Sequence, residues 1–519
     1  MRSLTKSSIR LTITELLLFA SAALVALLVV NRPPIFDDVL FGDDRQVWDG
    51  HVSGTYASSI QESLRNVSID KWRPVNTTAM IAILNMFGTS YQNYFWFSTV
   101  LIGALLVAVF VGAKSLLGRH QNRAAKVAMY LVVLVIGSSP FTYFGRSGVF
   151  GFLEFMPLVL CVSSFIIYQK AKIDHSRRSI VYSSLVALIG GLIHERYLAF
   201  SAVMMLLISL HARSEPRFKG LWLIYFGNIC FYVYSAGVVL NANTLKGGGE
   251  AKLNESAGLW ILSRVYFAML HLVGGAGGEQ VYFDPSRPTA FAPGMTFEQN
   301  YEWILPVVIG FVASLLCIGI VRESFRRTTP WEQQSSQSRL QFEMLLVATA
   351  LLIPGATVLQ RIEARWLFGS LVFSCLLLVS LTTVKTLLVR WSALGILCLL
   401  LIGNIYHRSS FAEYDWWRIR TKSVLDVIRE EEPATGYWNI AVTWPDRMDV
   451  HSGLGWSLGY GSVLRTLDNG PQTVLFGVID ELPTCPTPCL FVSVTDIGNQ
   501  FNDWRKSDFQ VVTTYWDNP

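Results

Sequence analysis

The chain has 519 residues, of which 52% are hydrophobic and only 15% are charged, and its formal net charge at pH 7 is +5. A soluble protein spends about a quarter of its residues on charge, so this composition excludes a disordered chain, a collagen-like repeat and a small disulfide-rich scaffold. The apolar residues form runs of roughly 17–25, long enough to cross a hydrocarbon core of about 30 Å. The sequence therefore predicts a polytopic membrane protein.

We predict eleven membrane-spanning helices. They cover residues 11–31, 91–113, 127–144, 151–169, 179–194, 197–211, 220–240, 303–321, 342–358, 366–384 and 391–407. The first has a basic flank that resembles the start of a signal peptide. Its apolar stretch is longer than that of a signal peptide and ends without a small-residue cleavage site, so we expect it to remain as the first helix.

The basic residues indicate which way the helices run. With the N-terminus in the cytoplasm, the cytoplasmic segments hold 20 of the 42 Lys and Arg residues within only 67 residues. Such an excess is typical of the short cytoplasmic loops of membrane proteins. We expect a cytoplasmic N-terminus and an external C-terminus, with anionic lipid headgroups rather than nucleic acid beside the basic loops.

Three predicted outer segments are too long to be simple connectors. They are the loops 32–90 and 241–302 and the tail 408–519. Residues 259–273 are apolar over too few positions for a span, so we expect a helix lying in the membrane interface. The expected architecture is a helical transmembrane domain, residues 1–407, followed by a small extracytoplasmic α/β domain, residues 408–519.

The tail carries the sequence pattern of an α/β domain. A helix is predicted over 414–431, and strands are predicted at 438–444, 473–478, 490–494 and 509–515, with turn residues between them. Two of the seven cysteines, Cys485 and Cys489, lie in this tail and the others fall inside predicted spans. Two ligands are too few for zinc. A local disulfide fits an oxidising compartment, and two free thiols are the alternative.

Four carboxylates, Asp37, Asp38, Asp43 and Asp44, follow the first span within eight residues. Ionised groups against the membrane are costly unless they are paired, coordinated or functional. Such a cluster could supply a general base, hold a divalent cation (Mg²⁺, Mn²⁺ or Ca²⁺) through oxygen ligands, or do both. The alternative is a solvated acidic turn that caps a helix.

Other ionisable residues gather at the predicted outer ends of the spans. Arg73, before Pro74, is expected at the interface, where a short helix begins. The others are Arg146 after the third span, Glu154 at the start of the fourth, His194, Glu195 and Arg196 in the turn between the fifth and sixth, and Arg361 and Arg365 on one helical face before the tenth. Each alone could be a charge that anchors a helix end. Mid-bilayer positions are almost free of ionisable residues, so together they indicate chemistry at the outer interface.

Arginines and carboxylates at this depth suit a substrate whose phosphate lies at headgroup level, with a reactive carbon above it. Arginines, or a metal ion held by carboxylates, could stabilise the charge on a leaving phosphate. A carboxylate could take the proton from an attacking hydroxyl. The sequence contains no phosphate-binding loop, dinucleotide fingerprint or zinc motif.

These features resemble the GT-C superfamily, whose members are polytopic glycosyltransferases that use polyprenyl-phosphate sugar donors. Asp37-Asp38 is similar to the acidic pair that follows the first helix in that superfamily, and Arg146 with Glu154 resembles an Arg and a carboxylate around the second outer loop. Trp72-Arg73-Pro74 resembles the O-antigen glucosyltransferases of the GtrII type, although a Gly usually precedes Arg-Pro there. The protein mannosyltransferases and aminoarabinose transferases form the other branch.

The resemblance implies a role for each candidate residue. It implies that Asp37, or Asp38 in second place, is the catalytic base. The additional pair Asp43-Asp44 leaves open which carboxylate acts, and with Glu154 these residues become candidates for metal or acceptor contacts. The implied substrate-binding residues are Arg73, Arg146, Arg361 and Arg365, with His194, Glu195 and Arg196 as further candidates.

The expected function is transfer of a sugar from a polyprenyl-phosphate donor to a glycan, lipid or protein acceptor, at the outer face of a bacterial inner membrane. Two alternatives remain open. An O-antigen polymerase or ligase would use a diphosphate-linked oligosaccharide and rely on arginines and a histidine in large outer loops. A transporter or flippase would place binding groups near the midplane and often show two similar halves, which this sequence lacks.

Overall fold

The fold is described from a computed structural model. It describes residues 12–31, 40, 42–54, 73–117, 122–146, 148–235, 280–282, 315, 336–357, 361–384, 386–406, 413–431, 438–444, 464, 471–478, 485–486, 488–496 and 509–516. The chain divides into two compact units. The larger comprises Met1–Arg32, Ile60–Met80 and Phe95–Ser409, and the smaller comprises Pro33–Ser59, Ile81–Tyr94 and Ser410–Pro519. The smaller unit thus combines the predicted tail with two parts of the predicted first outer loop, the second of which continues into the predicted span 91–113.

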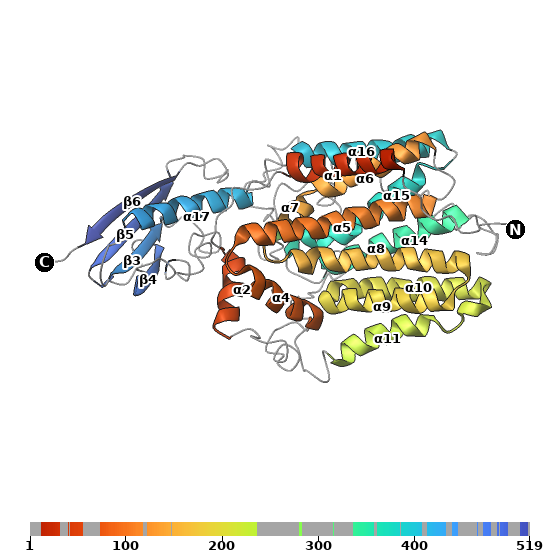
Figure 1. Ribbon diagram of the computed structural model, residues 1–519, viewed down its shortest axis with the longest axis horizontal. Coiled ribbons are helices and arrows are strands. Elements are labelled where there is room, and N and C mark those ends of the chain that lie inside the picture. Colours follow the sequence, from red (N-terminus) through yellow and green to blue (C-terminus); the bar gives the residue numbers. More distant parts are fainter. Residues whose placement is uncertain are drawn as a thin grey trace, which may run out of the picture. The chain divides into compact units, whose positions relative to one another are not determined.

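The larger unit is a bundle of helices (Figure 1). In chain order the helices are α1 (Ile13–Leu24), which continues into the π-helix η1 (Val25–Val30), α4 (Pro74–Phe87), α5 (Tyr91–Leu117), α6 (Arg123–Ser138), α7 (Pro140–Arg146), α8 (Gly151–Asp174), α9 (Arg177–Ile193), η2 (Glu195–Tyr197), α10 (Leu198–Ser214), η3 (Pro216–Phe218), α11 (Trp222–Val233), α14 (Ser336–Thr357), η7 (Ala364–Leu367), α15 (Phe368–Leu381) and α16 (Leu387–Tyr406). Part of α4 and the first residues of α5 belong to the smaller unit. Helix α6 packs against α1, α15 and α16, while α8 packs against α9, and α14 joins α10 to α15.

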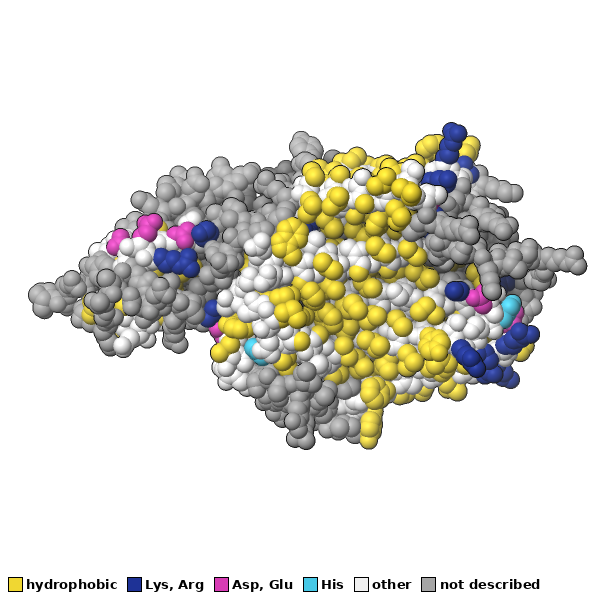
Figure 2. All heavy atoms as spheres, in the orientation of Figure 1, with side chains coloured by type: hydrophobic (Ala, Val, Ile, Leu, Met, Phe, Trp, Pro, Cys, Tyr) yellow, Lys and Arg dark blue, Asp and Glu magenta, His cyan; other side chains and the backbone are white. Residues whose placement is uncertain are grey.

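Five of the described helices are long and apolar enough to cross a membrane. They cover Ile13–Val30, Tyr91–Ser115, Gly151–Asp174, Glu195–Arg213 and Leu387–Ile405. Large apolar side chains such as Leu17, Val100 and Leu388 are exposed on the bundle. Figure 2 shows hydrophobic side chains across the visible face of the bundle, with lysines and arginines near one end. A soluble monomer does not expose an apolar surface of this extent, whereas lipid tails would cover it.

Most of the described residues in the predicted spans are helical. Residues 303–321 and the predicted interfacial helix 259–273 lie outside the described residues, apart from Leu315. One predicted span, 127–144, is interrupted: α6 ends at Ser138 and α7 begins at Pro140. Ser139 is extended, with φ −61° and ψ 142°. A residue before proline is pushed out of the helical region, which explains the break.

Ion pairs hold the bundle together at one end, which we call the Lys172 end. It is formed by Glu15, Lys114, Lys172, His175, Glu215 and Glu343. Lys114 Nζ lies 2.6 Å from Glu15 Oε2, and Lys172 Nζ lies 2.7 Å from Glu343 Oε1. Glu343 is almost completely buried and also accepts a hydrogen bond of 2.5 Å from Gln169 Nε2. These contacts join α1 to α5 and α8 to α14.

The tail of the chain combines a helix with a small sheet, as the sequence predicts. It contains α17 (Glu413–Glu430) and a sheet of four strands in the order β4 (Thr473–Val478), β3 (Asn439–Trp444), β5 (Cys489–Asp496) and β6 (Phe509–Trp516). Strand β3 is parallel to both β4 and β5, and β6 runs antiparallel to β5. Ile440, Val442, Leu490 and Val492 are buried in the domain core.

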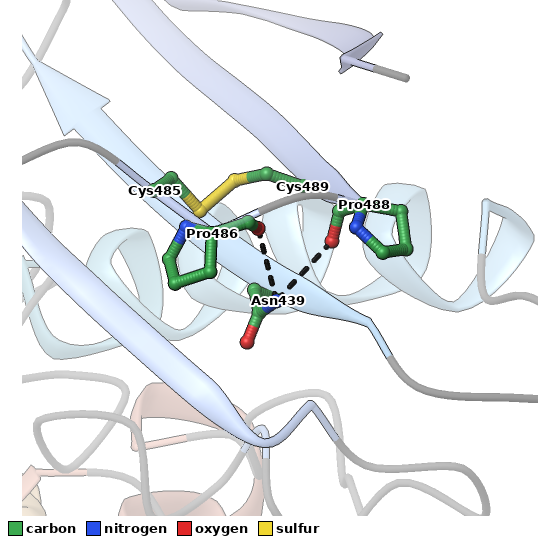
Figure 3. Close-up of a disulfide and its surroundings, with 5 residues drawn as sticks. All are labelled: Asn439, Cys485, Pro486, Pro488 and Cys489. Carbon is green, nitrogen blue, oxygen red and sulfur yellow. Dashed lines mark hydrogen bonds between the residues drawn. A yellow bond between two sulfur atoms is a disulfide. The ribbon is translucent and has the colours of Figure 1, made fainter. Parts of the chain in front are cut away.

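A disulfide between Cys485 and Cys489 closes a short loop before β5. Figure 3 shows Asn439, the first residue of β3, against this loop. The Asn439 amide Nδ2 donates to the carbonyl oxygens of Pro486 at 2.9 Å and Pro488 at 3.4 Å, and its backbone N–H donates to Pro488 at 2.9 Å. Asn439 is fully buried, so these bonds fasten the loop to the sheet away from water.

We expect Glu343→Ala to lower the free energy of unfolding by about 3 kcal/mol, because it leaves the Lys172 ammonium without its carboxylate in a poorly solvated place. Thermal unfolding in detergent micelles measures the change. Glu215→Gln is the matched control, because it removes a partly exposed carboxylate at the same end of the bundle. In the wild type, Glu215 Oε1 lies 3.4 Å from His175 Nδ1. The control should lower the free energy of unfolding by less than about 1 kcal/mol. An equal loss of stability in both variants would contradict a special role for the buried pair.

We expect Asn439→Asp to destabilise the tail domain more than Asn439→Ala. Alanine loses two hydrogen bonds, which costs about 1–3 kcal/mol, whereas aspartate also places a carboxylate against two carbonyl oxygens. The rate at which dithiothreitol reduces the Cys485–Cys489 disulfide, followed by alkylation and mass spectrometry of the peptide, reports on this loop in the full chain. Reduction should accelerate in the order wild type, Ala, Asp; equal rates would show that Asn439 does not hold the loop.

Candidate functional site

Arg73 and Glu195, 122 positions apart, form the centre of a polar cluster in the helix bundle. Arg73 precedes α4, and Glu195 lies in η2, the single turn between α9 and α10. The guanidinium is bidentate: Nε and Nη2 lie 2.5 Å from Oε2 and Oε1 of the carboxylate. The two side chains are 15% and 22% exposed, so the pair is partly open to solvent or ligand. Such a planar two-point contact is the arrangement with which Arg also holds phosphate.

His194 lies beside this pair, in the turn beyond the end of α9. Its Nε2 is 3.4 Å from Arg73 Nη2 and 3.0 Å from Arg196 Nη2. A guanidinium can only donate, so Nε2 faces two donors. Nδ1 faces the backbone N–H of Arg196 at 3.3 Å and Glu195 Oε2, also at 3.3 Å. A second proton on the imidazole would face these N–H groups, so the ring is neutral.

Arg196 extends the cluster to two other helices. Its Nη1 is 3.5 Å from Glu154 Oε2 in the first turn of α8, and its guanidinium lies 5.8 Å from the ring centroid of Trp366 in η7. The side chains of Arg196 and Glu154 are 8% and 5% exposed. We call Arg73, Glu154, His194, Glu195 and Arg196 the arginine cluster. With a neutral histidine, its formal charge is zero.

Local backbone geometry produces this cluster. Residue His194 leaves the helical region with φ −148° and ψ 120°, so α9 ends and η2 turns the chain back into α10. At the start of α8, Gly151 approaches Ser98 so closely that a Cβ would collide with the serine side chain. A larger residue would push the first turn of α8, and with it Glu154, away from α5. Two tight turns thus bring charges from α8, η2 and the start of α4 together.

Arg146 occupies a different position from the arginine cluster. It is completely buried, and its Nη1 donates to the carbonyl oxygens of Leu27 at 2.9 Å and Asn31 at 3.0 Å, where η1 ends. Its Nε donates to Thr99 Oγ1 at 3.0 Å, and the guanidinium lies 4.4 Å from the Phe95 ring centroid. A cation suits the carboxyl-terminal end of a helix. The structure therefore supports a role for Arg146 in joining α1, α5 and α7.

The predicted acidic cluster is described only in part. Asp37 and Asp38 lie outside the described residues, and of Asp43 only the backbone is described, in α2 (Gly42–Val52). Asp44 is a buried residue of the same helix. Asp44 belongs to the smaller unit and Glu154 to the larger. Within the described part of the chain, no three His, Cys, Asp or Glu side chains are grouped to hold a metal ion.

Arg361 and Arg365 are placed by their backbone alone. Arg361 begins the short strand β2 (Arg361–Glu363), which pairs with β1 (Gln280–Tyr282), and Arg365 lies in η7. The strand pairing joins the second long outer loop of the prediction to the segment before α15. The sequence predicts a helical face for these two arginines, whereas Arg361 is in a strand.

Sequence reasoning found every charged member of the arginine cluster but not how they pair. It predicted Glu195 as a substrate-binding residue, and the structure adds that this carboxylate contacts Arg73. It also did not single out Trp366 or the hydrogen bond of 3.0 Å between His51 Nε2 and Asn85 Oδ1, which joins α2 to α4. A tryptophan that directly follows Arg365, and a histidine in an acidic segment, were the available signals. Neither indicates its partner without a fold.

No protein-family model matches the chain, and no curated protein matches it. The site must therefore be interpreted from its own geometry.

We expect Arg146→Lys to lower the free energy of unfolding by about 2 kcal/mol, because a single ammonium cannot reach three acceptors that a guanidinium contacts through two nitrogens. Thermal unfolding in detergent measures the loss. Arg123→Lys, at an exposed position in the first turn of α6, is the control and should change little. A wild-type midpoint for Arg146→Lys would mean that the charge alone, and not the geometry of its hydrogen bonds, is required.

Proposed function

We propose that the protein is a membrane glycosyltransferase of the GT-C type, which moves a sugar from a polyprenyl-phosphate donor to a glycan, lipid or protein acceptor. The observation that supports this most is the contact of Arg73 and Arg196 with the same nitrogen of His194. Two guanidiniums that share one acceptor atom are close enough to bind the same phosphate. They also lie where membrane-length helices end, which supports a site at the level of lipid headgroups.

The proposed chemistry is a displacement at the anomeric carbon of the donor. The acceptor hydroxyl forms the new bond to that carbon while the bond between carbon and phosphate oxygen breaks, and the electron pair of this bond remains on the phosphate. Arg73 and Arg196 stabilise the charge on the departing phosphate. A carboxylate takes the hydroxyl proton. We assign that role to Asp37, with Asp38 as the second candidate.

The topology we propose has eleven spans with the N-terminus in the cytoplasm. The arginine cluster and the tail domain then lie outside the plasma membrane of a bacterium. The two ends of the bundle support this assignment, because the Lys172 end is built from segments that carry the predicted cytoplasmic excess of Lys and Arg. The tail disulfide agrees with an oxidising compartment on the other side.

A divalent cation would supply further electrostatic stabilisation of the leaving phosphate. Glu154 fits this role poorly in the described arrangement, because Arg196 occupies one of its oxygens. Asp43 and Asp44, which share one turn of α2, are the remaining candidates for oxygen ligands. The proposed steps depend only on the arginines and the catalytic carboxylate.

One observation favours a second candidate function, that of an O-antigen polymerase or ligase. Such enzymes rely on arginines and a histidine, and the arginine cluster has a histidine between two arginines. Their donor is a diphosphate-linked oligosaccharide instead of a monophosphate-linked sugar. The two proposals therefore differ in the donor that supports transfer.

We expect Asp37→Asn to abolish transfer of labelled sugar from a polyprenyl-phosphate donor in reconstituted vesicles, because an amide cannot accept the hydroxyl proton. A loss of about 10²–10⁴-fold is typical when a general base is removed. Asp426→Asn, in an exposed pair with Lys422 on α17, is the matched control and should retain wild-type activity. Full activity in Asp37→Asn and also in Asp38→Asn, or transfer from the diphosphate-linked donor alone, would contradict the proposal.

A further inference from the structure

The charge balance of the arginine cluster raises the question of how a phosphate could bind there. Two arginines are matched by two glutamates around a neutral histidine, so the cluster as it stands offers no net positive charge. Both donor nitrogens of the Arg73 contact are already satisfied by Glu195 at 2.5 Å. A phosphate that binds Arg73 in the same bidentate way must replace this carboxylate.

The two glutamates differ in how firmly they are held. Glu154 is 5% exposed and belongs to the first turn of α8, a helix of 24 residues. Glu195 is 22% exposed and belongs to η2, which has three residues and no continuing helix on its N-terminal side. Rotation of the Glu195 side chain therefore disturbs less packing than rotation of the Glu154 side chain.

We propose that Glu195 is an internal substitute for the substrate phosphate: it holds Arg73 when the site is empty and is displaced when a lipid-linked phosphate binds. A carboxylate and a phosphate present the same two-oxygen edge to a guanidinium, so each can complete the contact in turn. The exchange keeps Arg73 paired and oriented in the absence of donor. This inference rests on the proposed function, since it concerns the phosphate of that same site.

An internal competitor lowers the apparent affinity for phosphate, because part of the binding free energy is needed to displace the competitor from Arg73. Removing the charge of Glu195 while keeping its shape should remove this penalty. We expect Glu195→Gln to bind farnesyl phosphate, a short polyprenyl monophosphate, about tenfold more tightly than the wild type. Isothermal titration in detergent micelles measures the dissociation constants.

The ligands and variants are chosen to separate the possible causes. Farnesol tests the lipid tail alone, and inorganic phosphate tests whether a free anion is sufficient. Glu215→Gln removes a carboxylate at the Lys172 end and should bind farnesyl phosphate as the wild type does. In the double variant Arg73→Gln/Glu195→Gln, the gain in affinity for farnesyl phosphate should disappear, because the guanidinium that binds the phosphate is absent.

Glu195→Gln leaves Arg73 without its counter-ion, so the empty variant is expected to be less stable than the wild type. Farnesyl phosphate should then raise its unfolding midpoint by more than it raises that of the wild type, since at equal concentration a tighter ligand stabilises the folded state more. A purely structural partner of Arg73 would produce the stability loss without the tighter binding. The shift of the unfolding midpoint therefore distinguishes the two roles of Glu195 even if Glu195→Gln is less stable than the wild type.

Three results would overturn part of the argument. Equal or weaker binding by Glu195→Gln, with clear binding by the wild type, rejects the displacement of Glu195 but leaves the phosphate site of the proposed function standing. No binding of farnesyl phosphate by the wild type and all variants rejects both. Equal tightening by inorganic phosphate and farnesyl phosphate retains the displacement but assigns the site to a free anion, against the lipid-linked phosphate proposed here.

Discussion

Ion pairing between charged side chains at the ends of apolar helices determines which helix ends lie together in this protein. An ion that is taken out of water is costly unless an opposite charge and further hydrogen bonds compensate it. The described helices meet this requirement at both ends of the bundle, through Lys172 with Glu343 at one and Arg73 with Glu195 at the other. Each pair also joins segments far apart in the chain, so the condition that makes the charges tolerable also sets which helix ends lie together.

The two ends nevertheless differ in a way that bears on function. Glu343 is 2% exposed and is surrounded by donors from α8, which suits a fixed connection between helices. Glu195 is more exposed and sits in a three-residue turn. A pair that can be exchanged suits a binding site, because the free energy needed to open it is small compared with that of a buried pair. This contrast is why we place the substrate phosphate at Arg73.

Several parts of the fold followed from local patterns in the sequence. Apolar runs identified the helices because a lipid-facing helix must be apolar over its whole length, and alternation with turn residues identified the strands β3 to β6. The break before Pro140 was missed because the apolar pattern continues through it, while the backbone restriction that proline imposes on Ser139 is local and could have been noticed. The site was predicted as a list of charges at outer helix ends, and the sequence did not show that Arg146 of α7 contacts the end of η1.

The sequence by itself indicated a helical membrane protein, the position of most helices, the helix and strands of the tail and the charged residues at the helix ends, because hydrophobic length and charge placement are properties of the chain. Only the tertiary structure decided which charges face each other: that Glu195 holds Arg73, that His194 lies between two arginines, and that Arg146 closes a helix end. These contacts span up to 122 positions. No periodicity encodes them, since they depend on how the helices pack and on the directions in which the turns at Gly151 and His194 send the chain.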